Sequence, residues 1–400
     1  MNDYYLLTSE SVTEGHPDKM CDRISDALLD AYLSQDVDSH VALETVASKN
    51  TIFIAGEVSS KAKVDVIKTA RETIIKTGYD REEKGLSGKD CLILTNIGIQ
   101  SPDIARGVNQ TSGLIGAGDQ GMMYGFACDE TEEYMPLSHS LAHKLVKRLT
   151  QVRKEGVLPY LYPDGKSQVS VAYDEHGNVV GIKDIVVSAQ HSDAVSMEQL
   201  RKDIKREVID AVITEEDMLP EVKMHINPTG RFVIGGPAGD TGLTGRKIIV
   251  DTYGGIARHG GGAFSGKDPT KVDRSAAYMA RYAAKNIVAA GLCHRCEINL
   301  AYAIGVPQPV SVKVDTFHTE EIPYKVIEQI VKEVFDFSVA GIISKLSLIK
   351  VTYEPLSAYG HFGRTDLQLP WEKTDKITQL QQKAAEIMAE DITGLIRENT

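Results

Sequence analysis

One pattern recurs three times along this chain: a β-hairpin followed by an amphipathic helix. The hairpins are expected over residues 40–58, 167–187 and 296–317, and the helices over 65–75, 197–213 and 324–335. The strands are rich in β-branched residues, and the helices space apolar side chains by three and four. Repeats roughly 125–130 residues apart predict an α+β fold of three related sandwich-like domains, each a sheet with helices on one face, about a pseudo-threefold axis.

The repeats suggest a division of the chain. We expect an N-terminal α+β domain over 1–102, a central one over 116–235 and a C-terminal one over 236–400, with segments that interleave in space. Residues 100–121 contain Pro102, many small residues and no clear period. Because a long loop inside a compact domain is usually functional, we expect 103–115 to be a mobile active-site loop.

Composition narrows the class of protein. Of 400 residues, 42% are hydrophobic and 25% charged, as in ordinary globular proteins. No secretory signal or membrane-length apolar run is visible, and five scattered cysteines favour reduced thiols, so we expect a cytoplasmic protein without membrane contact. The net charge of −12 argues against nucleic acid as a partner. The lone Cys293-His-Arg-Cys296 favours helix packing over zinc or redox chemistry.

Basic residues are concentrated in one part of this acidic chain. Between Asp240 and Lys285 there are eight Lys and Arg against four Asp. Such an island favours attraction of a small anion. Solvated helix faces would explain Arg281 and Lys285 equally well.

A glycine-rich stretch lies inside the basic island. It opens at Gly260-Gly-Gly262, continues through Lys267, Asp268, Lys271 and Asp273, and then becomes helical. Glycines expose backbone N–H groups, lysines add charge, and the aspartates suit a divalent cation, so the stretch predicts a site for a polyphosphate with its metal. It is not a true P-loop, because Asp268 replaces Ser or Thr and no strand leads into it. A flexible loop with incidental charges remains the alternative.

A second candidate is Gly15-His-Pro-Asp-Lys19, where a helix is expected to begin. Pro17 suits the first helical position, and Met20, Ile24 and Leu28 then form an apolar stripe. His16, Asp18 and Lys19 therefore lie near a helix N-terminus, which suits a phosphate–magnesium unit. Asp18 would equally complement the helix dipole alone.

A pair of acids is expected on the first hairpin. If the turn is Ser48-Lys-Asn-Thr51, Glu44 lies opposite Ala55, and Glu57 is its diagonal neighbour on the same face. Two acids on one face among apolar residues suit a metal or an ammonium group. The alternative is a solvent-exposed face.

Three further segments carry weaker signals. Gly116-Ala-Gly-Asp-Gln-Gly121 has dinucleotide spacing but no preceding strand. The segments 158–169 and 235–253 each combine a glycine or turn, an acid, a base and a strand. The acid and base are Asp164 and Lys166 in the first segment, and Asp240 with Arg246 and Lys247 in the second. No Ser-His-Asp grouping or nucleophile elbow is recognisable.

Four of these motifs resemble one family. They are Gly15–Lys19, Gly116–Gly121, Asp240–Gly255 and Gly260–Ser275, in order along nearly the whole chain. The sequence is similar to methionine adenosyltransferase, also called S-adenosylmethionine synthetase, of the bacterial type. The resemblance implies a transferase of one-carbon metabolism that is a homodimer with shared active sites, often a dimer of dimers forming a homotetramer.

The resemblance also implies the reaction. The sulfur of L-methionine attacks C5′ of ATP and releases tripolyphosphate, which is cleaved to phosphate and diphosphate in the same site. The implied ions are Mg²⁺, two per site, and K⁺, one per subunit. A thioether carries no proton, so sulfur attack needs no general base, which fits the absence of a triad.

By motif match, the resemblance assigns individual roles. The catalytic residues are His16, Lys166, Arg246 and Lys267. The ATP-binding residues are these four with Asp164, Arg231, Phe232, Asp240, Lys247 and Ala263. The methionine-binding residues are Glu57, Gln100, Asp119, Asp240 and Lys271. Asp18 and Asp273 are the Mg²⁺ ligands, and Glu44 is the K⁺ ligand.

Two other classes of function remain open from the sequence. One is a kinase-like phosphotransferase that uses the Gly260 loop. The other is a nucleotide-binding regulatory protein without turnover.

Overall fold

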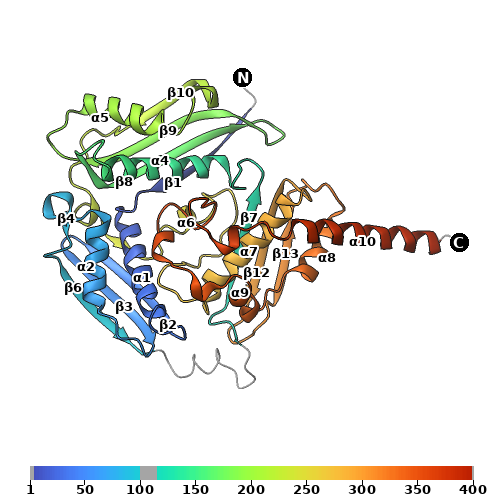
Figure 1. Ribbon diagram of the computed structural model, residues 1–400. Coiled ribbons are helices and arrows are strands. Elements are labelled where there is room, and N and C mark those ends of the chain that lie inside the picture. The colour runs from blue at the N-terminus through green and yellow to red at the C-terminus, as the bar shows by residue number, and fades with distance from the viewer. Residues whose placement is uncertain (1–3, 100–114, 399–400) are drawn as a thin grey trace.

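Three β-sheets, each with helices packed on one face, surround a common centre in the computed structural model (Figure 1). The structure describes residues 4–99 and 115–398. Mixed helix and sheet in three units confirms the predicted α+β fold. Gln100 and most of the predicted loop 103–115 lie outside the described residues.

The first sheet holds the first predicted hairpin. Its strand order is β11 (Gly242–Leu243), β2 (His40–Ser48), β3 (Thr51–Ser59) and β6 (Leu92–Gly98). The helices α1 (Pro17–Leu33) and α2 (Val66–Thr77) pack against it (Figure 1). A short ribbon of β4 (Asp80–Arg81), η1 (Glu82–Lys84) and β5 (Leu86–Ser87) lies beside them. The helix α1 begins where the sequence predicted, with Pro17 in its first turn and Met20, Ile24 and Leu28 fully buried.

The second sheet holds the second hairpin. Its order is β1 (Tyr5–Val12), β8 (Leu161–Tyr173), β9 (Val179–His191) and β10 (Met218–Ile226). The helices α4 (Leu137–Lys154) and α5 (Met197–Ile204) accompany it, followed by the π-turn η2 (Lys205–Ile209) and η3 (Glu215–Asp217). The predicted helix over 197–213 is therefore interrupted after Ile204, although Val208, Ile209 and Ile213 remain buried.

The third sheet holds the third hairpin. Its order is β13 (Ser311–Asp315), β12 (Arg295–Tyr302) and β7 (Gly121–Cys128). Around it lie α7 (Val272–Ala289), α8 (Tyr324–Val334), α9 (Val339–Lys345) and α10 (Ile377–Glu398). Short elements complete the chain: η4 (Gly236–Ala238), α6 (Ile248–Asp251), η5 (Leu348–Lys350), η6 (Glu354–Leu356) and η7 (Pro370–Glu372).

Strands are exchanged between the repeats. β1 precedes the first hairpin but pairs with β8 of the second. β7 precedes the second hairpin but pairs with β12 of the third. β11 follows the second hairpin but pairs with β2 of the first, through Gly242 opposite Ala47 and Leu243 opposite Val46. Segments distant in sequence therefore meet in each sheet, which is how residues from several motifs come together.

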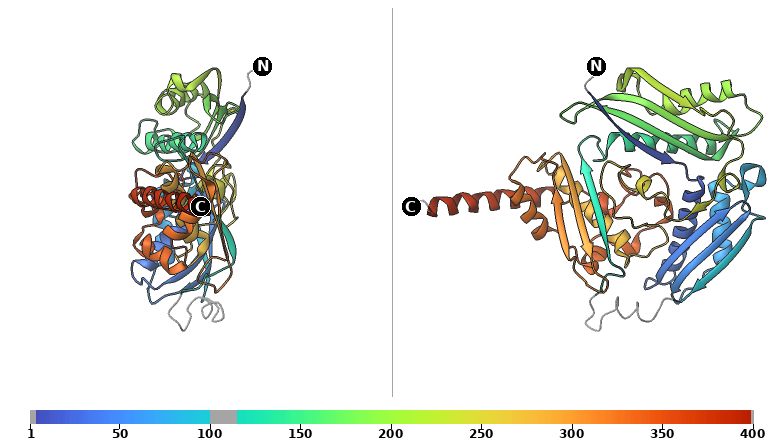
Figure 2. Two further views of the ribbon diagram at one scale, coloured as in Figure 1. Left: turned by 90° about the vertical axis from the view of Figure 1, so that its right-hand side faces the viewer. Right: turned by 180° about the vertical axis from the view of Figure 1, so that it is seen from behind.

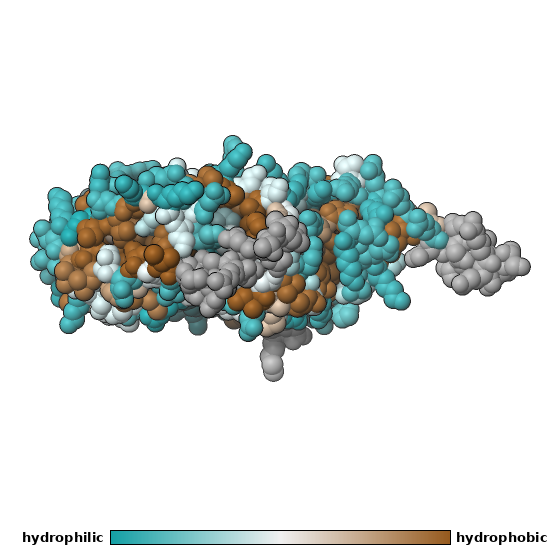
Figure 3. Space-filling model, turned by 90° about the horizontal axis from the view of Figure 1, so that it is seen from below, coloured by the Kyte–Doolittle hydropathy of each residue, from teal (hydrophilic) through white to brown (hydrophobic). Residues whose placement is uncertain are grey.

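The three sheets turn their helix-free faces to the same side of the molecule (Figure 2). Large apolar side chains are exposed there, including Phe53, Leu92, Leu94 and Met122. From below, apolar surface reaches the outside in patches (Figure 3). No helix of residues 4–99 and 115–398 is both long and apolar enough to span a membrane.

Two local predictions are wrong. Ile248–Asp251, expected as a strand after Lys247, forms the single helical turn α6, which turns the buried Asp251 towards Lys19. Cys293 and Cys296 do not pack within a helix, because α7 ends at Ala289 and Cys296 lies on β12. All five cysteines are buried and unpaired.

Candidate active site

The N-terminus of α1 holds two of the predicted residues in buried positions. His16 is the N-cap, and its Nδ1 accepts the backbone N–H of Asp18 at 3.2 Å. Burial and the charges of Lys247 and Lys166 lower the pKa of His16 to about 3, so the imidazole is neutral at pH 7. It offers a neutral hydrogen-bonding group beside lysines that supply the positive charge.

Asp18 joins this helix to the segment that follows β11. Its Oδ2 lies 2.6 Å from Nζ of Lys247, and its Oδ1 accepts the N–H of Leu243 at 3.0 Å. Burial acts to raise the pKa of Asp18, but Lys247 outweighs burial and holds the pKa below its usual value. Arg246 is exposed, with Nη1 3.9 Å from Asp18 Oδ1. His16, Asp18, Arg246 and Lys247 therefore form one group, which we call the α1 group.

The Gly260 loop lies along the edge of β2 and ends at α7. Gly266 has φ +78, and a Cβ there would meet the carbonyl oxygen of Leu43 at 1.9 Å, so only glycine fits. Lys267 pairs with Ala42 of β2, and its Nζ lies 2.6 Å from Oδ2 of Asp273. No strand leads into the loop, which confirms that it is not a P-loop.

Asp268 does not serve as the suggested cation ligand. Its side chain is buried and accepts hydrogen bonds from the backbone N–H of Val41 at 2.7 Å and of Thr270 at 2.9 Å. Lys271 also pairs with it. The carboxylate fixes the loop to β2, and its oxygens are already engaged.

The predicted register of the first hairpin is confirmed. Ser48 pairs with Thr51, Glu44 with Ala55 and Glu57 with Ala42, so the two acids are diagonal neighbours on one face. Both are exposed in the single chain. They line a cavity of about 350 Å³ together with Ala263 and Lys267.

A second cavity of about 450 Å³ adjoins the first and shares Glu57 and Lys267 with it. Its wall adds Asp119, Lys271 and Asp273. Acidic and basic groups therefore alternate around the combined space, as recognition of an amino acid and a metal-bound polyphosphate would require. We call the residues of these two cavities the β2 group.

Asp164 and Lys166 lie on β8. Burial raises the pKa of Asp164 to about 6, its Oδ2 accepts the N–H of Gly236 at 2.9 Å, and its Oδ1 has no hydrogen-bond partner among the described residues. Lys166 is exposed, and its charge acts on both His16 and Asp164. This strand therefore extends the α1 group.

The remaining predicted nucleotide residues lie apart from both cavities. The backbone N–H of Phe232 donates to Nε2 of His191 at 3.0 Å, and Arg231 pairs with Asp193 at the surface. Asp240 is exposed near the start of the segment that carries Arg246. Gln100 lies outside the described residues.

Comparison with known families gives matches along most of the chain. The N-terminal, central and C-terminal domain models of S-adenosylmethionine synthetase match residues 4–102, 114–232 and 234–373. Together they cover far more than half of it. The chain belongs to the S-adenosylmethionine synthetase family. It is a transferase, a methionine adenosyltransferase, and the family supports synthesis of S-adenosylmethionine.

The basic residues between Asp240 and Lys285 divide into some that are buried in the core and some that lie at the candidate site. Arg281 and Lys285 are not on a solvated helix face, because both are buried and pair with Glu372 at 3.0 and 2.6 Å. Arg274 is likewise buried against Asp26. Arg258 pairs with Glu297 and Asp315 on the third sheet. The four other cations of the island, at the candidate site, are Arg246, Lys247, Lys267 and Lys271. The sequence count therefore overstated the positive charge available to a ligand.

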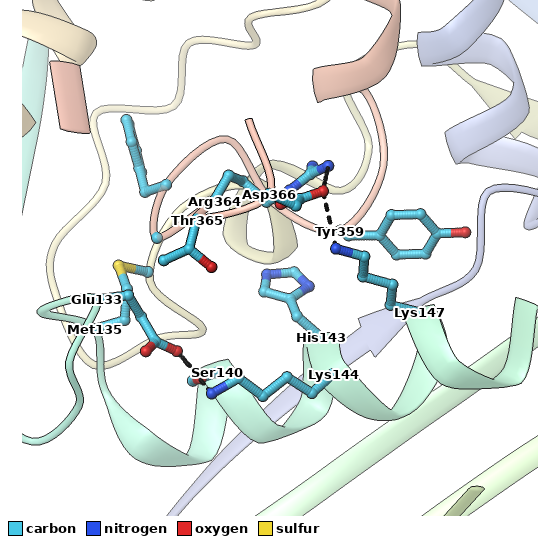
Figure 4. Close-up of a pocket in the computed structure, with 12 residues that line it drawn as sticks. Glu133, Met135, Ser140, His143, Lys144, Lys147, Tyr359, Arg364, Thr365 and Asp366 are labelled. Carbon is cyan, nitrogen blue, oxygen red and sulfur yellow. Dashed lines mark hydrogen bonds and ion pairs between the residues drawn. The ribbon is translucent and has the colours of Figure 1, made fainter. Parts of the chain in front are cut away.

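One more cavity, of about 80 Å³, lies between α4 and the 359–366 segment (Figure 4). Lys144 pairs there with Glu133 at 2.9 Å, and Lys147 with Asp366 at 2.8 Å. None of the residues assigned from the synthetase motifs lines it. It is therefore not part of the candidate site.

Sequence reasoning missed a row of aspartates on α1. Asp18, Asp22, Asp26 and Asp30 follow one another every fourth residue, so they share one helix face. Each accepts at least one backbone N–H from a distant segment: Leu243, Gly245, Gly266 and Tyr353. The spacing is visible in the sequence, but acids on a helix are usually solvated. We call these four residues the aspartate row.

The residues present fit magnesium only as an ion carried by a substrate. Within the described residues, no three His, Cys, Asp or Glu side chains gather to hold a metal ion. Asp18 and Asp273 instead each present a single carboxylate beside a lysine. Mg²⁺ is often held by one or two carboxylates together with substrate phosphates and waters, which is the arrangement that these residues allow.

Proposed function

We propose that this synthetase joins ATP and L-methionine by attack of the methionine sulfur on C5′ of ATP. Tripolyphosphate leaves and is then cleaved to phosphate and diphosphate in the same site. The observation that carries the proposal is the ring of half-exposed lysines and single carboxylates around the Gly260 loop, next to the two exposed acids of β2 and β3.

The basic residues supply the kind of charge that the leaving group requires. As the C5′–O bond breaks, negative charge grows on the triphosphate, and fixed cations stabilise that change. We assign this role to Lys166, Arg246, Lys247 and Lys267, with the neutral His16 as a hydrogen-bonding group near the bond. The sulfur needs only alignment with C5′, because it carries no proton to remove.

We assign largely separate sets of residues to the binding of the two substrates. We assign the nucleotide to Asp164, Arg231, Phe232, Asp240 and Ala263. We assign methionine to Glu57, Gln100, Asp119, Asp240 and Lys271. Glu57 would hold the ammonium group, and Lys271 the carboxylate, by charge complementarity.

Two kinds of ion complete the proposal. Asp18 and Asp273 would hold Mg²⁺, two ions per site, which neutralises phosphate charge when bound. Each aspartate pairs with a lysine in the single chain, and Mg²⁺ bound with the triphosphate would take the place of that lysine contact. Glu44 would hold one K⁺ per subunit on the exposed face of the first sheet.

We further propose a homodimer with shared active sites, assembled as a dimer of dimers. Among the described residues of one chain, no member of the α1 group lines either cavity of the β2 group. The helix-free faces of the three sheets carry exposed apolar residues, which suit an interface with a second copy. A second copy packed there would bring its α1 group to the β2 group of the first.

Free cysteines are consistent with the proposed cytoplasmic location.

One assay tests the reaction against its rivals. The enzyme is incubated with ATP, methionine, Mg²⁺ and K⁺, and the products are identified by mass spectrometry. S-adenosylmethionine with phosphate and diphosphate is the expected outcome. ADP would indicate the kinase-like phosphotransferase, and unchanged ATP the nucleotide-binding regulator.

A further inference from the structure

Asp26, the third member of the aspartate row, is buried beneath the Gly260 loop. Asp26 and Arg274 form an ion pair with both side chains at 0% exposure, and the two oxygens of Asp26 lie 2.9 and 2.7 Å from the two terminal nitrogens of Arg274. This bidentate geometry fixes both side chains. Neither group is accessible to a substrate.

The pair grips the backbone of the loop from two sides. Oδ1 of Asp26 accepts the N–H of Gly266 at 2.8 Å, and Nη1 of Arg274 donates to the carbonyl of Lys267 at 2.9 Å. On its outer edge, the carbonyl of Gly266 accepts the N–H of Leu43 at 3.0 Å. The backbone of Gly266 and Lys267 is therefore held by α1, α7 and β2 together.

The ammonium end of Lys267 is held less firmly. It extends into the cavity at 25% side-chain exposure, and among the described residues its ion-pair partner is Asp273, the residue next to Arg274 on α7. Two neighbouring residues of α7 thus contact opposite ends of Lys267. The backbone is fixed by a buried pair, while the charged end stays accessible to a ligand.

We propose that Asp26 and Arg274 are positioning residues that place Lys267 for charge stabilisation at the leaving triphosphate. The inference rests on the proposed function. A protein with two apolar side chains of similar volume in place of a buried ion pair is often as stable or more stable. Positioning of Lys267 is therefore a role for the pair that stability alone does not explain. A shift of about 1 Å in a catalytic group is enough to cost roughly 10²-fold in rate.

The test separates positioning from folding by removing both charges at once. In Asp26→Leu/Arg274→Met, no buried charge is left unpaired, and Met packs favourably on the ring of Tyr353, which now lies 4.3 Å from the guanidinium. We expect a folded enzyme with a kcat about 10²-fold lower and a KM for methionine close to wild type. A wild-type kcat in the folded double variant would overturn the proposal.

Coupling to Lys267 gives a second readout. If the pair acts through Lys267, adding Asp26→Leu/Arg274→Met to Lys267→Ala should lower kcat little further, because neighbouring residues that act together are not additive. Losses that multiply would show a general structural effect and overturn the proposal. If the double variant does not fold, Arg274→Lys replaces it, since lysine keeps the charge but not the fork that reaches the Lys267 carbonyl. A wild-type kcat in Arg274→Lys would then overturn it.

Asp30 supplies the matched control. It lies one turn further along the same row, accepts the N–H groups of Tyr353 and Glu354, and contacts no loop that carries a proposed substrate residue. Asp30→Leu should lower the melting temperature but leave kcat unchanged. The wild-type assay distinguishes a failure of the proposed reaction from a failure of the positioning role. If the wild-type enzyme forms no S-adenosylmethionine, the proposed function is refuted. If the wild-type enzyme forms it and the double variant is equally active, only the role of Asp26 and Arg274 is refuted.

Discussion

The first turn and the middle of α7 carry similar ion pairs in opposite surroundings. At its first turn, Asp273 pairs with Lys267 at 20% and 25% side-chain exposure. Further along, Arg281 pairs with Glu372 at 0% and 9% exposure, and Arg281 also donates to the carbonyls of Phe126, Glu133 and Tyr134. A ligand can separate the first pair cheaply, because water already reaches it. The second pair is bound into the core by several partners, so it serves the fold alone.

The largest expected effect is on the buried pair. Arg281→Met should leave Glu372 with Lys285 as its ion-pair partner and the N–H of Gly363 as a further donor, and should remove the guanidinium from three carbonyl groups. Removing one partner of a buried pair typically costs about 3–5 kcal/mol of stability. Thermal unfolding followed by circular dichroism measures it. A melting temperature equal to wild type would show that the two pairs do not differ as described.

The site pair should respond in activity instead. Lys267→Ala should fold normally and lose turnover by about 10²–10³-fold, or roughly 3–4 kcal/mol of transition-state stabilisation. The assay for S-adenosylmethionine measures kcat, with the melting temperature as control. Near-wild-type turnover would refute the phosphate role of Lys267.

Acid should destabilise the core through its neutral histidines. Burial lowers the pKa of His139 to about 4, below the unfolded value near 6.5, so the unfolded state binds more protons between these values. The contribution of the neutral His139 to the free energy of unfolding is complete above pH 6.5. It is lost as pH falls towards 4, on the order of 2–3 kcal/mol. Urea unfolding at pH 7, 6 and 5 measures it. An equal pH dependence in His139→Leu would count against this residue.

The exposed acids of the first hairpin should differ in the cation that they serve. Glu44→Gln should weaken activation by K⁺ at least about tenfold, since an anionic ligand is lost, and leave the KM for methionine less affected. Glu57→Gln, on the same sheet face, should show the reverse. Titrations of activity against K⁺ and against methionine separate the two. Identical responses in both variants would remove the proposed division.

The smallest effect is expected for an ion pair at the surface. Lys68 and Glu72 on α2 lie 4.0 Å apart at 68% and 67% exposure. Glu72→Gln should change stability by less than about 0.5 kcal/mol and leave activity unaltered. A larger loss of stability would mean that exposure alone does not rank these ion pairs.

The sequence by itself determined the features that depend on local periodicity. The three hairpins, the start of α1 at Pro17 and the shared face of Glu44 and Glu57 followed from side-chain alternation, a two-residue turn and apolar spacing. The motifs also identified the residues that line the cavities, among them Glu57, Lys267 and Asp273. Their residue types showed which chemistry to expect.

Only the tertiary structure decided how distant segments meet. Asp26 and Arg274 are 248 positions apart, and no local pattern marks them as partners. The same holds for the strands exchanged between sheets and for Ile248–Asp251, whose β-branched residues form a helical turn because Asp251 is drawn to the buried Lys19. Periodicity tells which face of an element is apolar, but burial of a charge depends on what packs against it. The basic island therefore divided into cations that serve a ligand and cations that hold the core.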